Sequence, residues 1–399
     1  MSRARADGLA ASALALAIAV TSCAPRRADV STPPPCAADA CDWSPLTALL
    51  DSAVAGDSSV YASPGAVLAV SYGGRRFVHG AGRLGTDDPT RPDGRTVYDL
   101  ASLTKVVGLT TAAMLAVDEG RLELDAPAQR YVPAFRGEGK EAVTVRHLLT
   151  HSSGLPPFRP LHRETATRAE ALALVDTTPL RFAPGTRMEY SDLGAIVLTQ
   201  AVEAALGARL DTLLERRLFA PLGMRDTRFL PPPGWRERIA PTERDPWRGR
   251  VLRGEVHDES AARLEGVSGH AGLFGSAEDL LVFGEWLLGQ RDTAASRNAL
   301  PRPAVAPMFF QRQELPPGSS RALGWDTPSE GSSAGTRLSA HAFGHTGFTG
   351  TSMWLDPDRR LVVVLLSNRV HPTRENPRWH PLRARIADLV VSTLHPSAR

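Results

Sequence analysis

The chain has 399 residues, with 46 arginine and lysine side chains against 43 acidic ones and a formal net charge of only +3. The basic residues are scattered among the acids, and no basic block or basic-aromatic alternation is present. We therefore expect no nucleic-acid partner. About 355 residues follow the N-terminal segment, enough for one large core or two closely packed lobes.

The N-terminus has the pattern of an export signal. Two arginines precede a small apolar run from Leu9 to Val20, which is too short to cross a bilayer as a helix. Val20-Thr21-Ser22-Cys23 then resembles a bacterial lipobox, so residues 1–22 are predicted to be a lipoprotein signal peptide and Cys23 the lipidated residue. The alternative is an ordinary signal peptide with an incidental cysteine. Ala24 in place of aspartate favours the outer membrane, if the cell has two membranes.

Residues 23–42 are rich in proline, alanine and charge, and are predicted to be a tether. Cys36 and Cys41 lie in this stretch, where export would place them in an oxidising compartment, so the sequence favours a small local disulfide. Residues 43–398, predicted to form the folded domain, contain no cysteine. A thiol nucleophile is therefore excluded there.

Hydrophobic spacing predicts the elements of the first half of the domain. A helix is expected from Trp43 to about Ala55, followed by a hairpin of residues 66–70 and 75–78 around Gly73-Gly74. From Ser102 to about Leu230 the pattern is mostly helical.

Strand character is expected again only near the C-terminus. A helix from Ala277 to Leu288 precedes it, and strands are predicted at Thr351–Leu355 and Leu361–Leu366, separated by the turn Asp356-Pro357-Asp358. A last amphipathic helix is expected from about Pro381 to Leu394.

Strands at both ends of the chain with helices between them predict an α+β fold in three layers. One antiparallel sheet is built from both chain ends and flanked by helices, with an all-helical lobe inserted at about residues 110–320. An active site is then expected where the sheet meets the helical lobe.

Only two lysines occur among the 46 basic residues, and one of them, Lys105, follows Ser102 by three positions. Arginine stays protonated in proteins, whereas a lysine can lose its proton when it is desolvated or near another cation. Residues three apart on a helix lie on the same face in adjacent turns. Ser102-Leu103-Thr104-Lys105 therefore indicates a nucleophile and its activating amine. The alternative is a surface serine and lysine that share this spacing by chance.

Two further segments are weak signals when each is taken alone. Tyr190-Ser191-Asp192 precedes a helical run, where a phenol beside an ammonium can act as general base or acid. The alternative is that the Ser-Asp pair caps the helix and the tyrosine only packs beside it. His345-Thr346-Gly347 stands just before the strand expected at Thr351. Its glycine would let a substrate approach the backbone, and its His and Thr could face a carboxylate or carbonyl.

In this order, the three segments resemble the serine hydrolases related to class C β-lactamases, D,D-peptidases and penicillin-binding esterases. The family forms are S-x-x-K, Y-S-N and K-T-G. The resemblance covers residues 43–395 and includes further phrases typical of the family: DLASLTK at 99–105, RHLLTHSSGL at 146–155, VHDE at 256–259, GHAGLF at 269–274 and SNRVHP at 367–372. The last three phrases are similar to those of a branch of envelope hydrolases that includes a small penicillin-binding carboxypeptidase.

The resemblance implies a β-lactamase/transpeptidase-like fold and a set of roles. Ser102 would attack a carbonyl and form an acyl-enzyme. Lys105 and Tyr190 would share the proton transfers, with Tyr190 the base toward the deacylating water. The backbone amides of Ser102 and Phe348 would form the oxyanion hole. The substrate would contact Asp192, His345, Thr346 and Gly347.

Two residues depart from the family pattern. Asp192 replaces an amide; its carboxylate would pair with Lys105, hold it charged and repel an anionic substrate. His345 replaces a lysine, which weakens carboxylate recognition at neutral pH, although a histidine occurs here in some peptidases and esterases of the family. Both changes argue against an efficient β-lactamase.

Other candidate motifs are interpreted as structural. Gly331-Ser332-Ser333-Ala334-Gly335 matches G-x-S-x-G, but it lies in a loop-like stretch without the strand and helix that a nucleophile elbow needs. The remaining acids and histidines could suggest a metal site, but no H-E-x-x-H spacing is present. We therefore interpret one group as a hydrogen-bonded wall of the cleft and the other as part of a helix end. The residues concerned are His257, Asp258, Glu259 and His270 for the wall, and His147 and His151 for the helix end.

The sequence therefore predicts an envelope serine hydrolase that forms an acyl-enzyme on an amide or ester, D,D-carboxypeptidase-like or esterase-like. The alternatives are a β-lactamase and a catalytically weak penicillin-binding or peptidoglycan-binding lipoprotein. The presence of Ser102, Lys105 and Tyr190 argues against the second alternative. We expect a monomer without cofactor or metal. Its partners would be a small-molecule or peptidoglycan-peptide substrate and, through a lipid anchor, the membrane of the cell envelope.

Overall fold

The computed structural model describes residue 36 and residues 41–56, 61–289 and 303–395. The predicted signal peptide, the lipidation site at Cys23 and most of the predicted tether lie outside the described residues. Cys36 and Cys41 form the local disulfide that the sequence favours, with their Cα atoms 5.4 Å apart. The amide of Cys36 donates to the carbonyl of Leu394 at 3.2 Å, so this part of the tether lies against the end of the last helix.

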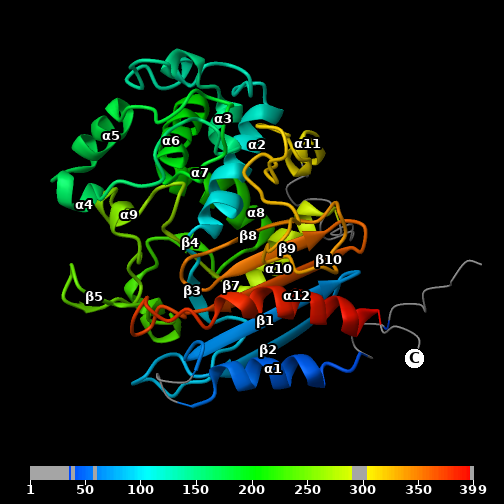
Figure 1. Ribbon diagram of the computed structural model, residues 1–399. Coiled ribbons are helices and arrows are strands. Elements are labelled where there is room, and N and C mark those ends of the chain that lie inside the picture. Colours follow the sequence, from blue (N-terminus) through cyan, green and yellow to red (C-terminus); the bar gives the residue numbers. More distant parts are fainter. Residues whose placement is uncertain (1–35, 37–40, 57–60, 290–302, 396–399) are drawn as a thin grey trace, which may run out of the picture.

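A five-stranded antiparallel sheet with the order β2-β1-β10-β9-β8 forms the middle layer (Figure 1). Its strands are β1 (Gly65–Tyr72), β2 (Arg75–Gly82), β8 (Phe343–Thr346), β9 (Ser352–Asp356) and β10 (Leu361–Ser367). β1 pairs with β10 along its length, from Ala66 opposite Ser367 to Tyr72 opposite Leu361. The prediction that both chain ends build one sheet is confirmed.

Both faces of this sheet are covered, which explains why its central strands are apolar without alternation in the sequence. On β1, Leu68 and Val70 belong to the core beneath the terminal helices, whereas Val67 and Ala69 belong to the core on the opposite face. Successive side chains of a strand point to opposite faces, so a strand buried on both sides is apolar at every position.

Helices cover the two faces of the sheet (Figure 1). The terminal helices α1 (Ser44–Val54) and α12 (His380–Leu394) share a core with one face, and α10 (Ala277–Leu287) packs on the other. Gly284 of α10 lets the helix approach the sheet, because a Cβ atom there would lie 2.6 Å from the side chain of Val362. The predicted three-layer α+β architecture is confirmed, and these three helices lie close to their predicted positions.

A lobe of mostly short helices stands above the sheet and shares its larger core (Figure 1). It contains a π-helical segment Lys105–Thr110, α2 (Thr111–Asp118), α3 (Val145–Leu149), α4 (Leu161–Glu164), α5 (Arg168–Thr177), α6 (Asp192–Leu206), α7 (Leu210–Leu214), a π-helical segment Glu215–Phe219, α8 (Ala220–Leu222), α9 (Glu259–Arg263) and α11 (Ala306–Phe310). Single 3-10 turns occupy Ala128–Arg130, Lys140–Ala142 and Pro233–Arg238.

The expectation that strands are confined to the hairpin and the C-terminal region is wrong. A second sheet joins β3 (Val97–Asp99), β7 (Leu273–Ser276) and β4 (Arg228–Phe229), and β5 (Arg244–Asp245) pairs with β6 (Arg250–Val251). These strands have two to four residues, too few to show a period of two in the sequence. β3, β4 and β7 exist because distant segments meet, whereas β5 and β6 form a short local hairpin.

Within the described residues, no single helix is long and apolar enough to cross a membrane. α6 and the segment 210–222 meet the length and composition criterion only as a pair bent by 62°. Most of α6 is buried in the core of the lobe.

The buried carboxylate of Asp279, in the first turn of α10, lowers the stability of the fold when it is ionised. It accepts hydrogen bonds from the amide of Asp226 (2.7 Å) and the hydroxyl of Thr227 (2.9 Å). Burial nevertheless raises the pKa of Asp279 from 3.8 to about 6. A raised pKa in the folded state means that stability is lost as the pH rises from the unfolded value through the folded one.

Asp279→Asn keeps a hydrogen-bond acceptor and removes the ionisation. We expect the free energy of unfolding of the variant, relative to wild type, to rise by about 3 kcal/mol between about pH 4 and about pH 7. Urea unfolding at both pH values measures this difference, with the exposed Glu237→Gln as the control for net charge. A variant-to-wild-type difference that is independent of pH would contradict the expectation.

Candidate active site

Ser102 lies on a tight turn between β3 and the π-helical segment that begins at Lys105. The preceding residue, Ala101, has a φ of 47°, a left-handed conformation that is unusual for a residue other than glycine. The buried carboxylate of Asp99 holds this turn by accepting from the amides of Ala101 (2.8 Å) and His257 (2.7 Å). The strained turn presents the Ser102 hydroxyl at the start of the helix.

The side chain of Lys105 lies directly beneath this hydroxyl and is almost fully buried, with 3% of its surface exposed. Its Nζ atom contacts Ser102 Oγ at 3.1 Å, the carbonyl of His270 at 2.9 Å and Asp192 Oδ1 at 2.7 Å. The helical spacing in the sequence therefore predicted the Ser102–Lys105 contact correctly.

Asp192 determines the charge of Lys105. Burial alone lowers the pKa of Lys105, but the negative charge of Asp192 and the neighbouring phenol of Tyr190 outweigh it and raise that pKa. The expected pairing of Asp192 with Lys105 is therefore present in the structure. Lys105 is an ammonium group at neutral pH, able to donate to Ser102 but not to take its proton.

Tyr190 lies over this ammonium, with its ring centroid 4.9 Å from Lys105 Nζ. The ring packs between the imidazoles of His151 (4.4 Å between centroids) and His345 (5.8 Å). His151 also accepts a hydrogen bond from the amide of Ser191 at 3.2 Å, so it fixes the backbone next to the phenol. Sequence reasoning had placed His151 only at a helix end; its position beside Tyr190 depends on a contact between distant segments.

If the ammonium form of Lys105 is required, Asp192→Asn will shift the pH dependence of activity. Without the carboxylate, burial lowers the pKa of Lys105, so the alkaline limb of kcat/KM is expected to move to lower pH. The measurement is a pH profile with an uncharged p-nitrophenyl ester, with the surface change Asp125→Asn as control. An alkaline limb that stays in place would show that it does not report Lys105.

The third motif stands just before β9, the strand expected at Thr351, as predicted. His345 and Thr346 also belong to a strand of their own, β8, the edge strand of the sheet, opposite Met353 and Ser352 of β9. β8 was not predicted, because it has four residues and contains a glycine, so its sequence does not show strand character.

The tight turn after β8 is held against the turn that carries Ser102. The hydroxyls of Thr349 and Thr351 donate to the carbonyls of Asp99 (2.7 Å) and Leu100 (3.0 Å). Any Cβ atom at Gly347 would lie 2.5 Å from the carbonyl oxygen of Leu100, so only glycine fits this approach. The segment with the predicted oxyanion donor, Phe348, is thus fixed next to Ser102.

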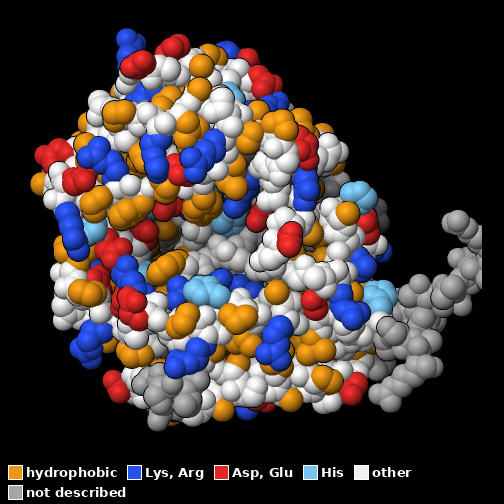
Figure 2. Space-filling view, in the orientation of Figure 1, with side chains coloured by type: hydrophobic (Ala, Val, Ile, Leu, Met, Phe, Trp, Pro, Cys, Tyr) orange, Lys and Arg blue, Asp and Glu red, His pale blue; other side chains and the backbone are white. Residues whose placement is uncertain are grey.

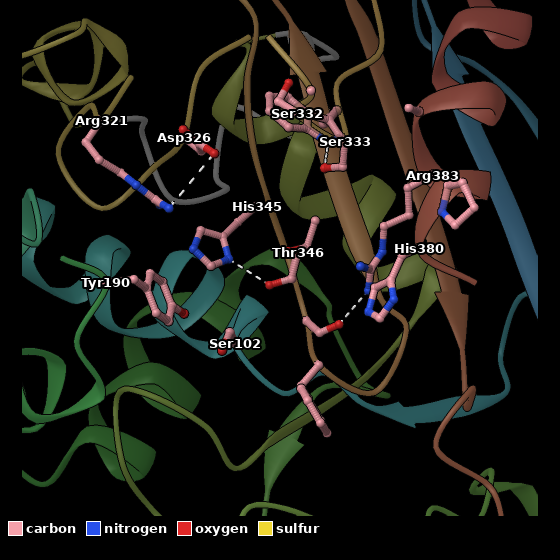
Figure 3. A pocket seen from close by; sticks show the side chains of 16 residues that line it. Ser102, Tyr190, Arg321, Asp326, Ser332, Ser333, His345, Thr346, His380 and Arg383 are labelled. Carbon is pink, nitrogen blue, oxygen red and sulfur yellow. Dashed lines mark hydrogen bonds and ion pairs between the residues drawn. The ribbon is translucent and has the colours of Figure 1, made fainter. Parts of the chain in front are cut away.

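A cavity of about 760 Å³ opens on the β8 side of Ser102. Figure 2 shows the hollow between the helical lobe and the sheet, and Figure 3 shows the side chains that line the cavity. Tyr190, His345 and Arg321 are grouped at one end, and Arg383 and His380 at the other. Neither arginine could be predicted as a cavity residue from the sequence, because 44 arginines are scattered along the chain.

Arg383 on α12 supports the wall of this cavity. Its Nη2 donates to the carbonyls of Gly347 (2.6 Å) and Thr351 (3.1 Å). Burial and the charge of Arg369 lower the pKa of Arg383 to about 10, so it remains a cation at neutral pH.

A second cavity of about 250 Å³ opens on the Asp192 side of Ser102, with Phe158 and Phe348 exposed at its surface. The acids and histidines of the VHDE and GHAG phrases line it. Asp258 accepts from the amide of Ala261 (2.7 Å) and pairs with His270 (3.0 Å). These contacts form the hydrogen-bonded wall that the sequence suggested. Among the described residues, no group of three or more potential ligands is arranged to hold a metal ion.

The G-x-S-x-G segment forms part of the larger cavity's wall. Ser332 and Ser333 line it, and the hydroxyl of Ser333 accepts a hydrogen bond from the indole of Trp354 at 3.1 Å. The segment is a series of turns outside helix and strand. It therefore lacks the nucleophile-elbow geometry, as the sequence indicated.

The sequence is similar to that of curated cell-wall enzymes. It is 32% identical over 359 residues to an N-acetylmuramyl-L-alanine amidase of Bacillus subtilis (strain 168), covering 80% of each chain. It is 31% identical over 344 residues to a putative D-alanyl-D-alanine carboxypeptidase of Salmonella schwarzengrund (strain CVM19633), covering 78% of this chain and 76% of the relative.

Solved structures share the fold at lower identity. A penicillin-binding protein homologue from Caulobacter crescentus gives a TM-score of 0.67 at 21% identity, over 87% of this chain and 97% of its own. A class C beta-lactamase gives 0.64 at 21% identity, over 82% and 91% of the two chains. The family model named Beta-lactamase matches residues 50–388. The chain therefore belongs to the beta-lactamase family, as a serine hydrolase of the superfamily that also includes the penicillin-binding proteins.

Proposed function

We propose that this serine hydrolase cleaves an amide bond in peptidoglycan fragments through an acyl-enzyme on Ser102. The observation that carries the proposal is the contact of Ser102 Oγ with the buried ammonium of Lys105, beneath Tyr190 and at the junction of two cavities. A nucleophile with a fixed charge and a phenol beside it is the arrangement that acyl transfer requires.

In the acylation step, Tyr190 acts as a phenolate and takes the proton of the Ser102 hydroxyl, becoming a neutral phenol, while Oγ attacks the carbonyl carbon. Lys105 keeps its proton, because Asp192 stabilises the ammonium. The amides of Ser102 and Phe348 donate to the oxyanion, which is worth several kcal/mol when donors are well aimed. As the C–N bond breaks, Tyr190 returns the proton to the leaving nitrogen.

In the deacylation step, the same groups act on water. Tyr190 takes a proton from the water that attacks the ester carbonyl, and the proton returns to Ser102 Oγ as the ester bond breaks. The ammonium of Lys105 holds Ser102 Oγ in place through both steps at a distance of 3.1 Å.

The substrate class comes from the relatives and the size of the cavities. The curated relatives are named for an N-acetylmuramyl-L-alanine amide bond and for a D-alanyl-D-alanine peptide bond, both of which occur in peptidoglycan. Cavities on two sides of Ser102 provide room for both an acyl group and an extended leaving group. These names support a role in the cell envelope, with anchoring through a lipid on Cys23 as the proposed means of retention.

Ester cleavage is the second candidate. The ion pair of Asp192 with Lys105 cancels the charge next to the nucleophile, which favours uncharged esters over anionic lactams. The fold neighbour EstCE1, with a TM-score of 0.65, is a hydrolase with acyltransferase activity.

One panel of substrates tests the proposal. Purified protein is incubated with N-acetylmuramyl-L-alanyl-D-isoglutamine, a peptide ending in D-Ala-D-Ala, a p-nitrophenyl ester and nitrocefin. We expect release of a peptide or amino acid from at least one of the first two, absent from Ser102→Ala. Turnover of the ester alone would replace the amidase proposal with the esterase.

A further inference from the structure

Three neighbouring side chains in the larger cavity carry polar atoms that the fold leaves unpaired. Tyr190 Oη, His345 Nε2, and Arg321 Nε and Nη1 are buried without a hydrogen-bond partner among the described residues. Tyr190 lies 5.8 Å from the His345 ring and 5.4 Å from Arg321 Cζ, and all three side chains line the cavity (Figure 3). Buried polar groups are costly unless paired, so this cluster indicates a place for a polar part of the substrate.

His345 provides an acceptor to this cluster. Its Nδ1 atom lies 2.8 Å from the carbonyl oxygen of Thr346, which can only accept, so Nδ1 carries the hydrogen. Burial and the positive charges of Arg321 and Lys105 hold the pKa of His345 well below its ordinary value. The ring is therefore neutral, and Nε2 presents a lone pair that needs a donor.

Arg321 provides donors only. Its nearest acid is Asp326, whose Oδ2 lies 3.9 Å from Nη2, while Oδ1 of Asp326 accepts from the Ser320 hydroxyl at 2.7 Å. Backbone hydrogen bonds between Asp326 and Gly344, each 2.9 Å long, fix the turn that carries Arg321 against β8. The guanidinium is thus held close to His345, with two N–H groups in need of an acceptor.

We infer that this cluster binds a carboxamide or peptide amide in the leaving group, and not a free carboxylate. The amide N–H donates to His345 Nε2, and the amide oxygen accepts from Arg321. A carboxylate can accept from Arg321, but it has no hydrogen to donate to His345 Nε2. A carboxylate oxygen would then lie against the lone pair of Nε2, with no hydrogen between the two acceptors. The leaving group belongs here because its nitrogen must come within reach of the Tyr190 hydroxyl to receive a proton.

The inference deepens the proposed function and rests on it for the identity of the leaving group. It assigns to the enzyme a leaving amine that continues as a peptide, or whose carboxyl is amidated, instead of a single C-terminal amino acid. Among the amide bonds of peptidoglycan fragments, this preference favours cleavage by an amidase or endopeptidase over removal of a terminal D-alanine.

The experiment compares two esters with the same acyl group, whose leaving groups are D-lactate and D-lactamide. They differ only in carboxylate against carboxamide, and their cleavage does not require amide hydrolysis. We expect kcat/KM for wild type to be roughly tenfold or more higher with the lactamide ester, the scale of one unpaired buried hydrogen bond.

Two substitutions and one matched control assign this preference to residues. His345→Lys offers only donors, so it should reverse the preference toward the lactate ester, whereas His345→Gln keeps an acceptor and should retain it. Arg321→Gln should weaken binding of both the lactate and the lactamide ester. His341→Lys makes the same change on a side chain that is 76% exposed and should leave the ratio unchanged. Product inhibition of wild type, with D-lactamide stronger than D-lactate, gives a second readout that needs no variant.

Equal or higher kcat/KM for the lactate ester in wild type overturns the inference, as does a ratio that His345→Lys leaves unchanged. A different outcome would contradict the proposed function without contradicting this inference. If muramyl-peptide and D-Ala-D-Ala substrates are both stable while the lactamide ester is preferred, the amidase proposal is wrong and the amide-binding site stands.

Discussion

Ser102→Ala is expected to abolish turnover and covalent labelling while leaving the fold intact. The hydroxyl is the only group of Ser102 that contacts Lys105 Nζ, and its removal deletes the nucleophile. The expected loss in kcat is about 10⁴- to 10⁶-fold, the scale seen when a serine hydrolase loses its nucleophile. Stability should change little, because one hydrogen bond contributes about 1 kcal/mol. Rates are measured with a p-nitrophenyl ester, and unfolding is followed in urea.

Mass spectrometry after treatment with a fluorophosphonate or a β-lactam locates the nucleophile. We expect the adduct on the peptide that contains Ser102 in wild type and no adduct in the variant. Ser52→Ala, at an exposed serine on the outer face of α1, is the matched serine control. An adduct on Ser333, the serine of the G-x-S-x-G segment, would disprove the assignment of Ser102.

Lys105→Arg keeps the charge and is expected to lower kcat/KM by roughly 10²-fold or more, the scale of a misplaced catalytic group. The Lys105 side chain is 3% exposed, and its Nζ is enclosed by Ser102 Oγ, the His270 carbonyl and the Asp192 carboxylate. A guanidinium is planar and larger than an ammonium, so it cannot make these three contacts from the same position. Ser102 and Tyr190 would lose their alignment.

The second lysine of the chain provides a matched control. Lys140 is also buried, with Nζ donating to the carbonyl of Asp176 at 2.5 Å, but it lines neither cavity beside Ser102. Lys140→Arg should lower stability through overpacking and leave kcat/KM of the folded protein near wild type. Near wild-type activity of Lys105→Arg would show that the position of the charge does not matter, and it would contradict the proposed role of the ammonium in holding Ser102 Oγ.

The sequence by itself determined the parts of this protein that depend on local spacing. The three-position spacing of Ser102 and Lys105 on one helical face predicted their contact, which is 3.1 Å long. The pairing of Asp192 with Lys105 at 2.7 Å was expected from the family resemblance, because the two residues are 87 positions apart in the sequence. Apolar runs predicted the strands β1 and β10, because hydrophobic patterning is a property of the local chain.

Only the tertiary structure decided the rest of the site. β8 and the short strands around β7 have two to four residues, too few for a periodic pattern in the sequence. β3 and β4 form because they pair with β7, which is distant from both in the sequence. Arg321 and Arg383 reach the cavity from two separate segments, and neither stands in a motif that marks it for the site. His151 stands in a family phrase, but its packing against the Tyr190 ring depends on a contact between distant segments. Whether His345 is charged depends on its burial and on Arg321, a residue 24 positions away in the sequence. Charge state and hydrogen-bond capacity are set by the surroundings of a side chain in space, which spacing along the chain does not specify.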